Sequence, residues 1–256
     1  CLGNLGLAYS NNSQFEEALD YFQRALPIAR ESGFRRGESN ILNNLAVTYF
    51  RLSRHETAIE YYEQSLDICR DIGNRRTEGG ILSNLAIASM VLGRHEEAID
   101  YLQRGLIISR AIGNQRSEGV QLGNLANSYL QLGMVEDAID YYTQALTIAR
   151  QINNQRSEGI HLNNLGIAYF QLGQTETAIT HFSQSLQIAK QVHNQRGQSA
   201  AYDELSTAYL MLGRGEESIE YGKAAVEISQ TIGATAIECE QRATLGWAYL
   251  AADKIK

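Results

Sequence analysis

Two kinds of hydrogen-bonding side chain recur along this chain at a fixed interval of 40 residues. The first is an asparagine that stands directly before a leucine, at Asn4, Asn44, Asn84, Asn124 and Asn164. The second is an arginine, at Arg36, Arg76, Arg116, Arg156 and Arg196. A carboxamide offers hydrogen-bond donors and an acceptor, so it can bind the N–H and C=O groups of a peptide whatever side chains the peptide carries. A guanidinium group binds carboxylates through two parallel hydrogen bonds. Together they could bind an acidic peptide.

Each series has a structural interpretation as well. An asparagine in mid-helix can bond to the neighbouring helix, which would explain its recurrence without a ligand. An arginine in the first helical turn opposes the helix dipole, at a cost of roughly a few tenths of a kcal/mol, so some group should compensate it. The candidates inside the chain are Asp71 and a glutamate two residues after each arginine, at Glu38, Glu78, Glu118 and Glu158. An acidic partner peptide is the functional candidate, and the sequence leaves both open.

The elements that carry these residues are pairs of helices. In residues 36–75, the apolar positions of the first part recur at offsets of three and four, which indicates a helix from Arg36 to about Leu52. A second helical stripe follows and ends near Ile72, with Cys69 as a small buried residue on it. Tyrosines such as Tyr49, four residues after the repeated leucine, are predicted to lie in the core. Each unit is therefore two antiparallel helices joined by a short turn.

Turn residues mark both ends of these helices. Glycines suited to a positive φ recur after the first helix, at Gly93, Gly133, Gly173 and Gly213. After the second helix the position holds Gly33, Gly73, Gly113, Asn153, His193 and Gly233. Asn and His are among the non-glycine residues that tolerate this conformation best. The asparagines that come next are predicted to cap the following helix, at Asn74, Asn114, Asn154 and Asn194.

Composition narrows the function classes. Of 256 residues, 44% are hydrophobic and 20% charged, and the net charge of −7 makes nucleic-acid binding by bulk electrostatics improbable. No apolar stretch is long enough to cross a membrane, so no membrane partner is expected. Three scattered cysteines, Cys1, Cys69 and Cys239, favour a reducing cytoplasm over a disulfide framework. No phosphate loop, metal-ligand pair or catalytic triad motif is present. We therefore expect no catalytic site, no metal, no cofactor and no enzyme activity.

The 40-residue unit resembles the tetratricopeptide repeat. In the second unit the resemblance is carried by Leu45, Ala46, Tyr49, Ala58, Tyr62 and Ser65. The usual repeat has about 34 residues, so these helices should be longer. The phrases ILNNLAVTY (41–49), HLNNLGIAY (161–169) and GNQRSEG (113–119) look like the longer repeats of kinesin light chains, of Pins/LGN-type spindle-orientation regulators and of bacterial signalling proteins.

The resemblance implies a fold and an organisation. The fold would be all-α, a right-handed superhelical solenoid of about six helix pairs plus one extra helix. Residues 1–256 would form one array, with units near 1–35, 36–75, 76–115, 116–155, 156–195 and 196–235 and a partial unit at 236–256. Repeat arrays need polar caps, and neither end supplies one, so Trp247 and Leu250 should lack cover. Self-association through these ends is a possible consequence.

The resemblance also implies a function. The asparagine before the repeated leucine would face the concave groove and bond the main chain of an extended peptide. Asn43, Asn163 and Asn127 would add amides, and the arginine series would select acidic side chains beside apolar anchors. The expected function is a protein–protein interaction scaffold with a protein or peptide partner. The alternative is a structural or self-associating regulatory spacer of a larger signalling protein.

Overall fold

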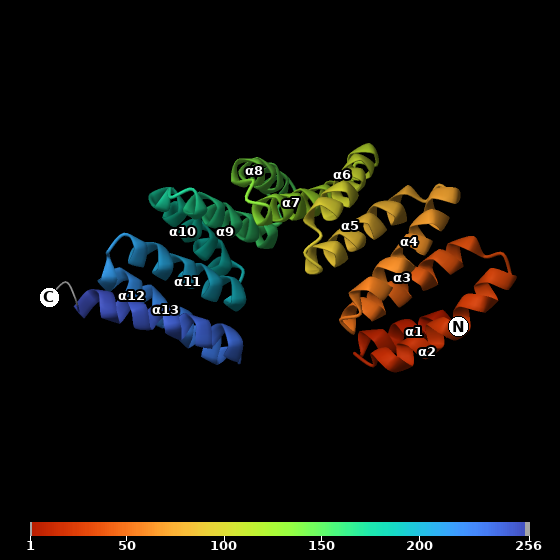
Figure 1. Ribbon diagram of the computed structural model, residues 1–256, viewed down its shortest axis with the longest axis horizontal. Helices are drawn as coiled ribbons and strands as arrows, with labels where there is room; N and C mark the ends of the chain where they lie inside the picture. The colour runs from red at the N-terminus through yellow and green to blue at the C-terminus, as the bar shows by residue number, and fades with distance from the viewer. Residues whose placement is uncertain (1, 254–256) are drawn as a thin grey trace. The chain divides into compact units, whose positions relative to one another are not determined.

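The computed structural model describes residues 2–253, and within that range the chain forms thirteen α-helices and no strand. The chain divides into two compact units, Cys1–Leu132 and Gly133–Lys256, which hold α1 to α7 and α8 to α13 (Figure 1). Cys1 lies outside the described residues. The all-α fold predicted from the repeat is confirmed.

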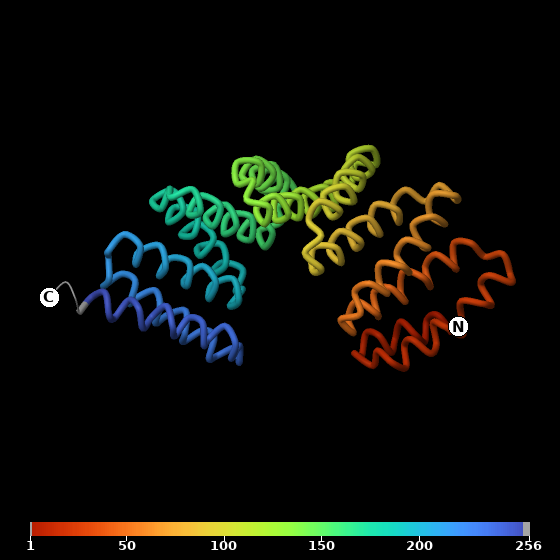
Figure 2. Tube along the Cα trace, viewed as in Figure 1, coloured from red at the N-terminus to blue at the C-terminus, as the bar shows by residue number. Residues whose placement is uncertain are grey.

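In the first unit the helices are α1 (Leu2–Asn11), α2 (Phe15–Glu31), α3 (Arg35–Arg51), α4 (His55–Asp71), α5 (Arg75–Val91), α6 (His95–Ala111) and α7 (Gln115–Gln131). In the second unit they are α8 (Val135–Gln151), α9 (Gln155–Gln171), α10 (Thr175–Gln191), α11 (Gln195–Met211), α12 (Gly215–Thr231) and α13 (Thr235–Asp253). Within each unit every helix packs against the next one along the chain, as the tube in Figure 2 shows. Helices two apart also meet, as α5 meets α7 and α9 meets α11.

The predicted turns are confirmed at both ends of the helices. All the glycines expected after first and second helices have a positive φ, between 66° and 76°. Asn153 and His193 adopt the same left-handed conformation, with φ of 53° and 52°. The four predicted cap asparagines each accept a hydrogen bond from the backbone N–H three residues on, as Asn114 does from Ser117 at 3.2 Å. Local sequence thus fixes where each of these helices begins and ends.

The core of each unit is built from the repeated leucines and the small residues beside them. Leu45, Leu85 and Leu125 are completely buried, as are the alanines that follow them. In the fifth repeat the small residue is Gly166, and a Cβ there would clash with the ring of Phe182. Cys69 is fully buried, as predicted.

The prediction that the repeated tyrosines lie in the core holds for Tyr49, which is 8% exposed, but is wrong for others. Tyr9, Tyr169 and Tyr209 are half-buried, and Tyr249 is 44% exposed. Four of these tyrosines stack on a ring of the following helix, and such stacking does not require full burial. Tyr49 stacks on Tyr61 with ring centres 5.3 Å apart, and the pairs Tyr9–Tyr21, Tyr169–His181 and Tyr209–Tyr221 repeat this geometry.

The last described helix carries exposed apolar side chains. On α13, Trp247 is 65% exposed and Leu250 is 56% exposed, which agrees with the expectation that they lack cover. None of the helices in residues 2–253 combines the length and the apolar character that crossing a bilayer requires.

Candidate functional site

A first set of arginines forms ion pairs between consecutive repeats. Glu38 in the first turn of α3 accepts from Arg30 at the end of α2, with 3.0 Å between Nε and Oε1. The same pair recurs one repeat apart as Arg70–Glu78, Arg110–Glu118 and Arg150–Glu158. Both partners are also placed well in the helix dipoles, the cation in a last turn and the anion in a first turn. These arginines, which we call the paired series, connect each second helix to the next first helix.

A neighbouring arginine adds to two of these pairs. Arg35 donates to Glu38 at 2.8 Å and lies 3.4 Å from Asp71, and Arg75 donates to Glu78 at 2.9 Å. The Glu38 and Glu78 side chains are only 8% and 5% exposed. The internal carboxylates that the sequence offered as partners for the second arginine series are therefore bound by other arginines.

The predicted site arginines form the second set, which we call the unpaired series: Arg36, Arg76, Arg116, Arg156 and Arg196. Each occupies the second position of a first helix and is exposed. Within residues 2–253 none of the five forms an ion pair. Adjacent residues on a helix point about 100° apart, so Arg35 reaches Glu38 while Arg36 faces another direction.

The predicted site asparagines are less uniform. Asn4 is exposed, and Asn44, Asn84, Asn124 and Asn164 are half-buried, as are the added amides Asn43, Asn127 and Asn163. Asn164 on α9 forms a hydrogen bond to the hydroxyl of Tyr142 on α8, and it acts against the burial that raises the pKa of Tyr142 to about 12. The Oδ1 atom of Asn163 is shielded from solvent and accepts no hydrogen bond from the described residues.

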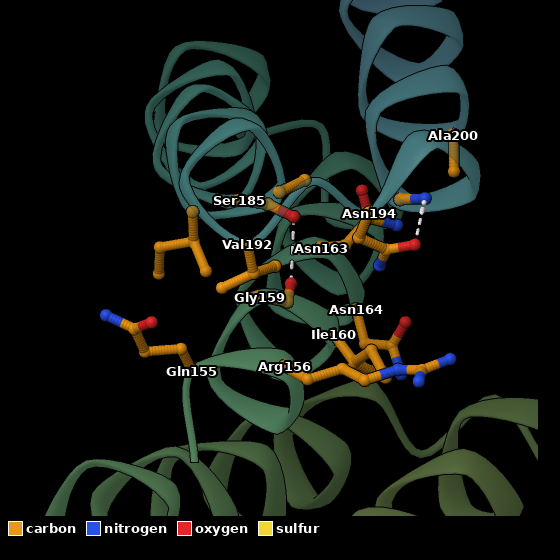
Figure 3. Close-up of a pocket in the computed structure, with 13 residues that line it drawn as sticks. Gln155, Arg156, Gly159, Ile160, Asn163, Asn164, Ser185, Val192, Asn194 and Ala200 are labelled. Carbon is orange, nitrogen blue, oxygen red and sulfur yellow. Dashed lines mark hydrogen bonds between the residues drawn. The ribbon is translucent and has the colours of Figure 1, made fainter. Parts of the chain in front are cut away.

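One pocket in the second unit brings together three predicted site residues. It has a volume of about 180 Å³ and lies between α9, α10 and α11 (Figure 3). Three lining residues follow Arg156 on α9: Ile160 four residues later, Asn163 seven residues later and Asn164 eight residues later. At these spacings all four side chains lie on one face of the helix. The remaining lining residues are Gln155, Gly159, Ser185, Ile188, Ala189, Val192, Asn194, Gly197 and Ala200. Figure 3 shows Arg156 beside Ile160 and Asn164, with Ser185 of α10 and Val192, just past the end of α10, on the facing side.

A second hollow adjoins this pocket. Its volume is about 430 Å³, and its lining includes Arg156, Val192 and Asn194, which it shares with the first. It adds Arg196, so two arginines of the unpaired series border one surface. The remaining lining residues are His193, Gln195 and Ile232. The combined surface offers two guanidinium groups next to an apolar pocket.

The first unit contains a pocket at the same register, between α1, α2 and α3. Its volume is about 700 Å³, and Asn4, Asn43 and Asn44 line it together with Leu7, Ile28 and Phe34. None of its lining residues is ionisable: the others are Leu2, Gly3, Ala25, Ala29, Ser32, Gly37, Asn40 and Ile41. This pocket therefore has the amides and the apolar wall but not the arginine. The other predicted residues, Asn84, Asn124, Asn127, Arg36, Arg76 and Arg116, lie on α3, α5 and α7 outside these two pockets.

Sequence reasoning missed four residues that line the two pockets and are smaller than their counterparts in other repeats. At the end of the second helix, the repeats carry isoleucine at residues 72, 112, 152 and 232, but Val192 and Ser32 replace it beside the pockets. In the first turn of the next helix, the repeats carry Thr77, Ser117 and Ser157, but Gly197 and Gly37 stand beside the pockets. The two reductions in size coincide where the first repeat meets the second and where the fifth repeat meets the sixth. A comparison of repeats position by position would have shown this signal.

The sixth repeat places acids where earlier first helices carry neutral residues. Burial, and secondarily the neighbouring Asp203, raises the pKa of the Glu204 carboxyl to about 7. Burial, and secondarily Glu240, raises the pKa of Asp203 to about 6. Burial also lowers the pKa of His161 to about 4, so this side chain is neutral near pH 7. In residues 2–253 no group of three His, Cys, Asp or Glu side chains is arranged to hold a metal ion.

Comparison with known families and structures agrees with this geometry. The tetratricopeptide repeat family matches residues 2–71, 78–151 and 157–231, which together make up most of the chain. The chain belongs to the tetratricopeptide-repeat family. Folds of this family are generally non-catalytic, and their repeats support protein interaction. No curated protein matches the chain in sequence.

Three solved tetratricopeptide-repeat structures illustrate the likeness in fold. A signal transduction ATPase with a tetratricopeptide repeat sensor from Pyrococcus horikoshii superposes with a TM-score of 0.81 at 22% identity, covering 97% of this chain and 41% of that protein. The BtubC (BKLC) protein of P. vanneervenii gives 0.75 at 20% identity, covering 86% and 92%. A Rap protein complexed with competence and sporulation factor gives 0.65 at 15% identity, covering 98% and 75%. At these identities the likeness concerns the fold.

Proposed function

We propose that this chain is a protein-interaction scaffold that binds an extended peptide segment containing acidic and apolar side chains. The unpaired arginine series carries the proposal. Four arginines of the same chain are neutralised by buried or half-buried glutamates, yet the five that recur at the second helical position have no carboxylate partner in residues 2–253. A first-turn cation is mildly unfavourable for its own helix. Its fivefold presence is explained by an external acidic partner.

The charge distribution supports selection of acidic partners. The chain has a net charge of −7, so acidic peptides are repelled by most of its surface. Unneutralised guanidinium groups on the first helices give those helices a local positive edge. A partner with carboxylates in matching positions should bind these arginines faster and more selectively than a partner without them, because its charges complement the arginines. The guanidinium fork can engage each carboxylate through two hydrogen bonds.

Amides and apolar walls provide the rest of the proposed surface. In each pocket, asparagines lie beside exposed or partly exposed apolar residues, such as Ile160 beside Asn163 and Leu7 beside Asn4. A carboxamide can bond the peptide main chain while the apolar wall accepts a side chain. Because each net hydrogen bond contributes about 1 kcal/mol and an extended peptide must be ordered, we expect affinities of about micromolar strength.

The proposed partner is a protein or peptide, and the chain is proposed to act by binding and without catalysis. The Rap protein that shares this fold was solved with competence and sporulation factor, which shows that the fold is compatible with a bound factor in that protein. The cytoplasm is the proposed location because the cysteines are few, and Cys69 is buried without a disulfide. A spacer role, with association of the chain with itself, is the competing function.

Display of random peptides against the purified chain tests the proposal. We expect enrichment of peptides that combine acidic and apolar residues, and loss of that enrichment in the double variant Asn84→Ala, Asn124→Ala. The matched control is Asn114→Ala, which removes a helix cap and costs about 1 kcal/mol but no groove amide. Enrichment should survive in this control. Absence of enriched peptides on the wild-type chain would contradict the proposal and favour the spacer role.

A further inference from the structure

We propose that the pocket between α9, α10 and α11 is a specificity pocket that accepts one apolar side chain of a bound peptide, with an acidic side chain next to it held by Arg156. The inference rests on the proposed peptide-binding function and deepens it by naming the pocket and the residues that select the ligand. The occupant is an internal segment of a partner protein, because the surface continues past the pocket to a second arginine, Arg196.

Two specific replacements widen the pocket. Val192 is one methylene smaller than the isoleucine found at this register in four other repeats. Gly197 replaces the serine or threonine of the three preceding repeats, and a Cβ there would lie 2.5 Å from the Nδ2 atom of Asn194 and 3.4 Å from the Cβ atom of Ala189. Both residues line the pocket. Both positions therefore carry smaller side chains than their counterparts in other repeats, and the larger residues would narrow the pocket.

Size and lining define the side chain that fits. The volume of about 180 Å³ is comparable to an apolar cavity of roughly 150 Å³ that admits benzene. Ile160, Ile188 and Val192 supply branched apolar walls, and Ala189 and Ala200 supply small ones. A leucine, methionine or phenylalanine side chain matches this space. An alanine leaves most of it empty, so the pocket discriminates by apolar area buried.

Polar groups at the pocket define what stands beside the apolar side chain. Arg156 lines the pocket, is exposed and has no carboxylate partner in residues 2–253. The half-buried Asn163 also lines the pocket, and its shielded Oδ1 atom has no donor in that range. Arg196 borders the adjoining hollow. These groups fit a peptide in which the apolar residue has an acidic residue next to it in sequence.

Defined peptides and a pocket-filled variant test the inference. The probes are nine-residue peptides with acetylated N-termini and amidated C-termini, of sequence Ser-Gly-Ser-Asp-Xaa-Asp-Ser-Gly-Ser, with Xaa as Ala, Leu or Phe. Binding is followed by NMR titration of the ¹⁵N-labelled chain. We expect Leu and Phe peptides to bind at least tenfold more tightly than Ala, with shifts at Ile160, Val192 and Gly197. Replacing both Asp residues of the probe by Asn should weaken binding.

The double variant Val192→Ile, Gly197→Ser places at the junction of the fifth and sixth repeats the residues that other junctions carry, so the fold is expected to hold. It should lose the preference for Leu and Phe over Ala. The control Ile72→Val removes one methylene at the same register of another repeat and should keep the preference. An unchanged preference in the filled variant overturns the inference, as does tighter binding of a peptide that ends in a free leucine carboxylate.

The two proposals fail in different ways. If display against the wild-type chain enriches peptides but the filled variant enriches the same peptides, the pocket assignment is wrong while the scaffold function stands. If no displayed peptide is enriched and none of the nine-residue probes gives shifts, both are wrong.

Discussion

The arginines at the ends of the second helices and the arginines at the starts of the first helices have the same chemistry and opposite surroundings. Arg30, Arg70, Arg110 and Arg150 each bind a glutamate of the next helix. The unpaired series stands on the very helices that carry these glutamates, yet it has no ion pair in residues 2–253. The two regions differ because the glutamate side chain faces the end of the preceding second helix, where the paired series stands, while the arginine two residues before the glutamate points to another side of its own helix. One region holds the repeats together, and the other is available to a partner.

This difference shows how a repeat array separates stability from binding. A paired arginine in a favourable dipole position stabilises the repeat, whereas an unpaired first-turn arginine is slightly unfavourable in the free protein. Residues of the first kind should affect unfolding, and residues of the second kind should affect binding. The following variants test through stability which polar side chains are structural and which are left for binding, in order of decreasing expected effect.

The largest stability change is expected at Glu204, a half-buried carboxyl that no cation neutralises in the described range. Its folded-state pKa of about 7 lies above the ordinary value of 4.5, so the folded chain holds the proton more tightly than the unfolded chain. The contribution of Glu204 to stability therefore falls as pH rises from about 4.5 to about 7 and is constant above that range. Glu204→Gln should raise the free energy of unfolding by about 2 kcal/mol at pH 8.

Urea unfolding of wild type and Glu204→Gln at pH 8 and pH 4.5 measures this effect. At pH 4.5 the two proteins should have nearly equal stability, because the glutamine resembles the protonated acid. A gain of the same size at both pH values would show that the effect does not arise from ionisation.

A smaller loss is expected on breaking a pair. Glu78 is 5% exposed and accepts from both Arg70 and Arg75, so Glu78→Gln removes the charge from two hydrogen bonds. We expect a loss of about 1.5 kcal/mol in the free energy of unfolding. The matched variant Glu118→Gln, at a side chain 18% exposed, should lose less because solvent screens its pair more. Equal values for the two variants would count against this reasoning.

The asparagine series also contains a structural and a non-structural member, Asn164 and Asn84, whose effects on stability can be compared. Asn164 bonds the hydroxyl of Tyr142, and its replacement by alanine should lower the free energy of unfolding by about 1 kcal/mol. Asn84 has no side-chain hydrogen bond to the rest of residues 2–253, so Asn84→Ala should have a smaller effect. Thermal unfolding compares them directly. A larger loss at Asn84 would identify it as a structural residue.

The smallest effect is expected in the unpaired series itself. Arg116→Gln removes a first-turn cation that opposes the dipole of α7, so the free energy of unfolding should change by less than about 0.5 kcal/mol and should not fall. Arg110→Gln is the matched variant, because Arg110 binds Glu118 at 2.8 Å, and it should destabilise. A marked loss on replacing Arg116 would place it among the structural arginines.

The sequence was sufficient to predict the fold and its turns. The 40-residue spacing of leucines, the glycines at positive φ and the cap asparagines such as Asn114 are local features, and each has a local physical cause. The tyrosines were mispredicted because helical spacing identifies the face that packs but not how deep a ring lies. Tyr209 shows this, since it stacks on Tyr221 without being fully buried.

The site could be predicted only in part. The sequence placed Arg156 and Asn164 on one helix face, and both line the same pocket. It could not decide which arginine Glu78 would bind, because neighbouring arginines differ only in their direction from the helix axis. The pocket is lined by Val192, just past the end of α10, and by Gly197 on α11, and a single-helix pattern carries no information about such a combination.

Binding by the unpaired series is the central claim, and two arginines six residues apart test it. Fluorescence anisotropy would measure the affinity of the Asp-Leu-Asp peptide for wild type, Arg156→Gln and Arg150→Gln at low and high salt. We expect Arg156→Gln to bind about tenfold more weakly, with a difference that shrinks at high salt, and Arg150→Gln to bind like wild type although its ion pair with Glu158 is lost. Equal affinity of wild type and Arg156→Gln at low salt would contradict the account.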